Sequence, residues 1–69
     1  MQRITLAAAR VTRGMTQAEL ANKMGVSRSI INKWETGKSK ISTTSLYAFC
    51  YVTGFRVDDI ILPETSTKS

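Results

Sequence analysis

The stretch TQAELANKMGVSRSIINKWETGK, residues 16–38, decides the fold of this 69-residue chain. It opens with T-x-x-E, in which Thr16 and Glu19 can each accept a hydrogen bond from the other's backbone N–H. This capping box predicts a helix that begins at Gln17. Gly25 follows about two turns later and can adopt the left-handed conformation that ends a helix. The first part of the stretch therefore predicts one short helix and a tight turn.

A second helix is predicted directly after this turn. Ser27 is a suitable N-cap, and Gly37 is a suitable stop after Glu35. At about 100° per residue, the apolar face of this helix carries Ile30, Ile31 and Trp34, and the opposite, polar face carries Arg28, Ser29, Asn32 and Lys33. Such a helix can pack on a core with one face and enter a major groove with the other. The pattern alone fits an ordinary helical hairpin equally well.

The full residue pattern is more specific than its periodicity. As T-Q-x-E-L-A-x-x-x-G-V-S-x-x-x-I-x-x-W-E-x-G-K, it closely resembles the helix-turn-helix of the Cro/cI-like (XRE) family of transcriptional regulators, and the resemblance covers residues 3–62. It implies an all-α fold, a compact five-helix lambda-repressor-like DNA-binding domain whose helices 2 and 3 form the helix-turn-helix. The expected organisation is a DNA-binding domain at residues 1–62, with its helix-turn-helix core at 16–36, and a polar C-terminal tail at 63–69.

The resemblance also implies roles for the polar residues. Relatives read bases from the positions held here by Arg28, Ser29, Asn32 and Lys33. Arg28 could pair with guanine and Asn32 with adenine, because each side chain can make two hydrogen bonds to a base edge. Whether Lys33 reaches a base or a phosphate stays open.

Contacts to the DNA backbone are expected before and after the helix that Ser27 and Gly37 bound. Gln17 matches the family position that contacts a phosphate, at the positive end of its helix. The turn that follows the second helix, with Thr36, Lys38 and Lys40, would hold the neighbouring phosphate. These contacts would position the protein on the duplex without specifying a sequence.

A helix that precedes the motif, the first of the domain, is predicted over residues 3–13, with Leu6, Ala9 and Arg10 on its inward side. In proteins that this chain resembles, an arginine at this position pairs with the glutamate of W-E-x-G, here Glu35. A partly buried pair would fix the angle between two helices more than it would add net stability. The alternative is a solvated arginine that contributes little.

Two further helices are predicted in the second half of the chain. Ser42 or Thr43 can cap a fourth helix that ends at Gly54, and a short fifth helix is predicted over Asp58–Leu62. The loop before the fourth helix is less determined, because Ile41 stands where the family usually has a proline.

Length and composition exclude several other classes of protein. A chain of this length forms one small domain, and its apolar fraction of 42% is typical of globular proteins. No apolar run approaches the ~20 residues that span a membrane, and arginines interrupt the apolar residues near the N-terminus, which argues against a signal peptide. A soluble, cytoplasmic protein is therefore expected.

Catalysis and metal binding are not expected. The chain has no histidine and one cysteine, Cys50, which excludes zinc fingers, histidine-based acid–base catalysis and an internal disulfide. Cys50 falls in an apolar pattern typical of a core residue. The adjacent carboxylates Asp58 and Asp59 would point in different directions on a helix, so they do not form a metal site. We expect no enzyme activity, no metal and no cofactor.

The positive charge is concentrated in the helix-turn-helix region. The net charge is +5, but residues 1–56 hold nine basic residues against two acidic ones, and residues 57–69 are net negative. Arg28, Lys33, Lys38 and Lys40 are predicted around one exposed face. A basic face of this kind favours a polyanionic partner.

The expected partner is a double-stranded DNA operator, bound by a weak homodimer that assembles on the DNA. The predicted contact surface between the copies comprises Ile41–Thr44, Tyr47 and Phe55–Asp58. The function expected first is that of a small phage- or mobile-element-type repressor. Alternatives are an antitoxin-like autorepressor and a protein-interaction module that modulates another repressor. An exposed Ile30 beside the polar face would favour the interaction module.

Overall fold

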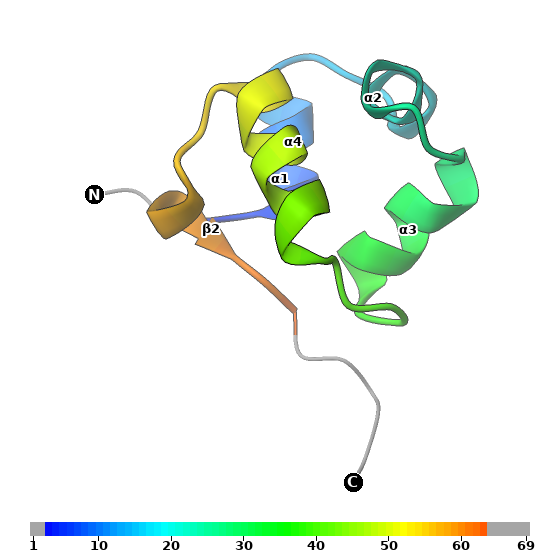
Figure 1. Ribbon diagram of the computed structural model, residues 1–69. Coiled ribbons are helices and arrows are strands. Elements are labelled where there is room, and N and C mark those ends of the chain that lie inside the picture. The colour runs from blue at the N-terminus through cyan, green and yellow to red at the C-terminus, as the bar shows by residue number, and fades with distance from the viewer. Residues whose placement is uncertain (1–2, 64–69) are drawn as a thin grey trace, which may run out of the picture.

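Four α-helices form most of the structure over residues 3–63, the part of the chain that the computed structural model describes (Figure 1). They are α1 (Leu6–Thr12), α2 (Gln17–Met24), α3 (Arg28–Thr36) and α4 (Thr43–Thr53). The shorter elements are strand β1 (Ile4–Thr5), the 3₁₀ turn η1 (Val57–Asp59) and strand β2 (Ile60–Ile61). In Figure 1, α2 and α3 lie on one side of the domain, and η1 and β2 lie on the other. Residues 64–69 of the predicted tail lie outside the described residues.

The start of α2 is the predicted capping box. Thr16 Oγ1 accepts a hydrogen bond from the backbone N–H of Glu19 at 3.0 Å, and Glu19 Oε1 accepts one from the backbone N–H of Thr16 at 2.8 Å. Gly25 ends the helix with φ at +72°, in the left-handed region that other residues rarely adopt. The predicted first helix of the motif and its turn are therefore confirmed.

The caps of α3 and α4 also fall where the sequence places them. Ser27 caps α3 by accepting a hydrogen bond from the backbone N–H of Ile30 at 3.1 Å, and Gly37 ends it with φ at +81°. Of the two predicted caps for α4, Ser42 is the one used, since its hydroxyl accepts from the backbone N–H of Ser45 at 3.1 Å. Each of α2, α3 and α4 thus begins at an N-cap side chain and ends at a glycine with positive φ.

The first element of the chain differs from the prediction. The helix expected over residues 3–13 begins only at Leu6, because Ile4 and Thr5 form strand β1 and pair in parallel with Ile60 and Ile61 of β2. Thr5 also caps α1, its hydroxyl accepting a hydrogen bond from the backbone N–H of Ala8 at 3.1 Å. The prediction of helix at residues 3–5 is therefore wrong.

The prediction of a fifth helix is also wrong. In place of a helix over Asp58–Leu62, the chain makes one 3₁₀ turn at Val57–Asp59 and then enters β2. Asp59 Oδ2 accepts a hydrogen bond from the backbone N–H of Arg56 at 3.2 Å, which closes this turn. Ile60 follows and is buried, so pairing with β1 and burial of an isoleucine replace another helical turn. Within the described residues, the fold has four α-helices and a two-stranded parallel sheet.

All helices contribute to one hydrophobic core. Its buried members are Leu6, Ala9, Leu20, Ala21, Ile31, Trp34, Ile41, Phe49, Cys50, Phe55 and Ile60. The loop before α4, whose path the sequence leaves open, is anchored by Ile41, which is only 6% exposed. An apolar side chain in this loop therefore adds to the core, and the polar residues around it stay at the surface.

Candidate nucleic-acid interface

The outer face of α3 is polar along its whole length. The four residues predicted there, Arg28, Ser29, Asn32 and Lys33, are all exposed. On the opposite face Ile31 and Trp34 are 1% and 7% exposed and hold the helix against the core. Because these buried side chains hold α3 in place, the exposed polar side chains have fixed positions relative to one another. Arg28, Ser29 and Asn32 also line an open hollow on this surface.

Ile30 is not presented beside these polar residues as an exposed apolar side chain. It is half-buried and packs against the hydrophobic core. Among the described residues of α3, the exposed ones are therefore all polar or charged. Such a surface offers hydrogen-bond donors and acceptors, which is what the edges of base pairs require.

The turn after α3 continues the basic surface. Lys38 and Lys40 are exposed, and the backbone N–H of Lys38 donates to the carbonyl oxygen of Lys33 at 2.9 Å, which fixes the path of the turn. Thr36 is exposed, but its hydroxyl donates to the carbonyl oxygen of Asn32 at 2.9 Å. The hydroxyl of Thr36 is thus held against its own helix, and the two exposed lysines are the charged groups of this turn.

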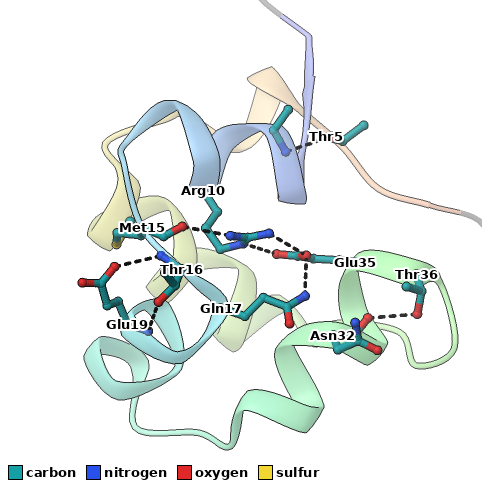
Figure 2. A network of polar contacts seen from close by, with 10 residues as sticks. Thr5, Arg10, Met15, Thr16, Gln17, Glu19, Asn32, Glu35 and Thr36 are labelled. Atoms are coloured by element: carbon teal, nitrogen blue, oxygen red, sulfur yellow. Dashed lines mark hydrogen bonds and ion pairs between the residues drawn. The ribbon is translucent and has the colours of Figure 1, made fainter.

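A polar network connects the start of α2 with the end of α3 (Figure 2). Arg10 Nε donates to Glu35 Oε2 at 2.7 Å, and Arg10 Nη2 donates to Glu35 Oε1 at 3.2 Å. Arg10 Nη1 donates in addition to the carbonyl oxygen of Met15 at 2.8 Å. The side chains of Arg10 and Glu35 are 14% and 7% exposed. Both charges are therefore compensated inside the domain, and Arg10 is not part of the exposed basic surface.

Gln17 belongs to the same network. It is the first residue of α2 and half-buried, and its Nε2 donates to Glu35 Oε1 at 2.9 Å. The sequence does not predict this bond, since Gln17 and Glu35 are 18 residues apart and meet only through the packing angle of α2 and α3. The predicted phosphate contact thus starts from a side chain that is already held by the protein.

The comparison with protein families agrees with this geometry. A family model described as helix-turn-helix matches residues 6–60, which span all four α-helices. The chain belongs to the Cro/cI-like (XRE) helix-turn-helix family. As a member of this family, it is a DNA-binding regulator. No curated protein gives a significant match to the chain.

Over residues 3–63, no helix has the length and apolar character needed to cross a bilayer. The same residues contain no group of three or more His, Cys, Asp or Glu side chains that could hold a metal ion.

The pKa of the Cys50 thiol is raised, chiefly because the thiol is buried and secondly because Asp59 nearby is negatively charged. The thiol is therefore protonated at neutral pH.

Proposed function

We propose that this chain is a sequence-specific regulator of transcription that binds duplex DNA with α3 in the major groove, as a small repressor of the phage or mobile-element type. The observation that carries the proposal is the outer face of α3, where four exposed polar side chains stand opposite a deeply buried apolar face. An α-helix of this kind has the width and the hydrogen-bonding groups for the major groove.

The proposed contacts divide into two kinds. Arg28, Ser29 and Asn32 read bases, because they are exposed on the outer face of α3 and can form hydrogen bonds to base edges. Lys33 completes this row and extends toward either a base or the backbone. Lys38 and Lys40, with Gln17 at the start of α2, hold the phosphate backbone. Thr36 joins them when its hydroxyl turns from the carbonyl oxygen of Asn32 to a phosphate.

We propose further that the DNA-bound form is a two-fold dimer. One recognition helix covers only a few base pairs, and two copies related by a two-fold axis would place their α3 helices in successive major grooves, about 34 Å apart. Tyr47 and Val57, which are 60% and 37% exposed, supply side chains for the contact. Ile41 and Phe55 do not, contrary to the sequence-based prediction, because both are buried in the core of their own subunit.

A second function is favoured by α4. Its tyrosines Tyr47 and Tyr51 are 60% and 90% exposed, and exposed aromatic residues are enriched at protein–protein interfaces. The alternative is therefore a protein-interaction module that controls another regulator through α4. Under this alternative α3 has no specific DNA site.

Selection of bound fragments from random duplex DNA, at a stated salt concentration, tests the proposal. We expect an enriched motif with an inverted repeat. We also expect the affinity to fall steeply with salt concentration, because the lysine and arginine side chains of the protein displace counterions from the phosphates when they bind. Arg3→Ala is a matched control for loss of one positive charge, since Arg3 is exposed and directly precedes β1, outside α3 and the turn after it. If no duplex binds even at low salt, the interaction module replaces the proposed repressor.

A further inference from the structure

The carboxylate of Glu35 accepts hydrogen bonds from side chains of two other helices. Arg10 of α1 binds both of its oxygens, and Gln17 of α2 binds Oε1 (Figure 2). The side chain of Glu35 is 7% exposed, so these partners replace most of its contact with water. The carboxylate is therefore a fixed acceptor between the helices of the motif.

This acceptor determines how the amide of Gln17 is oriented. An ionised carboxylate cannot donate, so only the Nε2 side of the amide can face Glu35. The amide nitrogen carries two N–H groups, and the bond to Glu35 uses one of them. Among residues 3–63, the second N–H has no hydrogen-bond partner within the protein, so a ligand can accept from it. A side chain that is already ordered loses less conformational entropy when the ligand binds.

Gln17 stands where a phosphate is favoured by the helix as well. It is the first residue of α2, and the first backbone N–H groups of a helix have no acceptor within the helix. The helix dipole is positive at the same end. A free carboxylate beside this point would repel a phosphate, but both oxygens of Glu35 are bound by Arg10. Arg10 thus allows Glu35 to orient Gln17 without a net negative charge.

We propose that Glu35 is a positioning residue for DNA binding: it holds the amide of Gln17 so that the second N–H of Nε2 meets a phosphate of the DNA backbone, and Arg10 compensates the charge of Glu35. This inference rests on the proposed DNA-binding function. It assigns a role in affinity to a pair of buried residues that do not themselves touch the DNA.

The first test removes the pair without changing the net charge. The double substitution Arg10→Met and Glu35→Met deletes one positive and one negative charge, and replacing a buried pair by apolar residues of similar size avoids an uncompensated charge. Because the hydrogen bond of Gln17 to the phosphate loses its preorganisation, we expect affinity for the selected operator to fall about two- to tenfold. The slope of affinity against salt should stay unchanged, since no phosphate-binding cation is lost.

A double-mutant cycle separates positioning from a general structural effect. Gln17→Ala should weaken binding at least as much as loss of the pair, and combining the two should cause no loss beyond that of Gln17→Ala alone, because the pair acts only through the Gln17 contact. Lys38→Ala is the matched control, and its effect should multiply with loss of the pair. If Gln17→Ala also multiplies with loss of the pair, the positioning role is refuted.

A comparison of two carboxylates tests the sign of the effect. Removing a negative charge near DNA should raise affinity if only long-range electrostatics matters. Glu19→Gln, which keeps the capping box because glutamine can replace glutamate there, should therefore bind equally well or better. Glu35→Gln should bind about two- to tenfold less well, because glutamine offers one acceptor oxygen in place of two. An increase for Glu35→Gln would overturn the proposal.

The order of the Gln17 amide can be measured in the free wild-type protein, so the test does not depend on a variant that folds. Nuclear magnetic resonance of the side-chain amides should find Gln17 ordered before DNA is added, in contrast to exposed Asn22 and Asn32. A mobile Gln17 amide would refute positioning even if the wild type binds its operator. Failure of the wild type to bind any duplex would instead refute the DNA-binding function on which the inference rests.

Discussion

The guanidinium of Arg13 lies over the ring of Phe55, with its central carbon 4.3 Å from the ring centroid. Arg13 Nε also donates to the carbonyl oxygen of Thr53, so the end of α1 is bound to the end of α4. With Arg10 paired to Glu35, two arginines of the chain serve the fold. The total of ten basic residues therefore overstates the charge that is free to meet a polyanion.

Arg13→Ala should lower the free energy of unfolding by about 1–3 kcal/mol, because it removes a cation–π contact and a charge-assisted hydrogen bond. Thermal melts of the variant and the wild type measure the loss. Val11→Ala is the control on the same helix, since Val11 is 62% exposed and should melt within a few degrees of the wild type. Equal melts for Arg13→Ala and the wild type would show that the contact is not formed in solution.

Trp34→Ala should unfold the domain or nearly so. Trp34 is 7% exposed in the core, and truncating a buried tryptophan costs about 3–5 kcal/mol, comparable with the whole stability of a small domain. Circular dichroism during heating measures the loss of helix. Tyr51→Ala provides an aromatic control, because its side chain is 90% exposed and should contribute little. A cooperative melt near the wild-type temperature for Trp34→Ala would contradict the packing of α3.

Arg28→Ala and Asn32→Ala should relax base preference at particular operator positions, by about 1–3 kcal/mol each. Lys38→Ala and Lys40→Ala should weaken binding to all sequences about equally and reduce the salt dependence, because phosphates are the same at every position. Affinity measurements on a set of single-base operator variants distinguish the two patterns. A uniform loss for all four substitutions would reject the proposed division into base and phosphate contacts.

The Cys50 thiol should make stability depend on pH in the alkaline range. Its pKa is raised in the folded state, so the unfolded chain loses this proton at lower pH than the folded one. The associated stability is fully present at neutral pH and is lost as pH rises from the ordinary thiol pKa toward the raised value. Melting temperatures of the wild type should therefore fall more steeply with pH than those of Cys50→Ala. Parallel curves would mean that the thiol is accessible to water.

The helices of the motif could be predicted because their limits are local. The capping box of Thr16 and Glu19, the cap Ser27 and the stop at Gly37 all act within four residues along the chain. The inward faces followed from the helical period, which places Ile31 and Trp34 on one side. These features need no knowledge of the rest of the fold.

The parts that could not be predicted depend on distant partners. Strand β1 has two residues and exists because Ile4 pairs with Ile60, which local sequence does not reveal. The same pairing replaces most of the predicted fifth helix by a turn and a strand. In the candidate site, the residue types at α3 were visible in the sequence, but the bond between Gln17 and Glu35 required the packing of two helices.

The pairing of β1 with β2 also sets an order of events during synthesis. Ile4 is made before all four helices, and its strand partner Ile60 is made after them. The helices can dock on one another while the chain is still growing, but the sheet can form only afterwards. A chain released before residue 60 would keep β1 unpaired beside an incomplete core, and quality-control proteases preferentially degrade such unfinished chains.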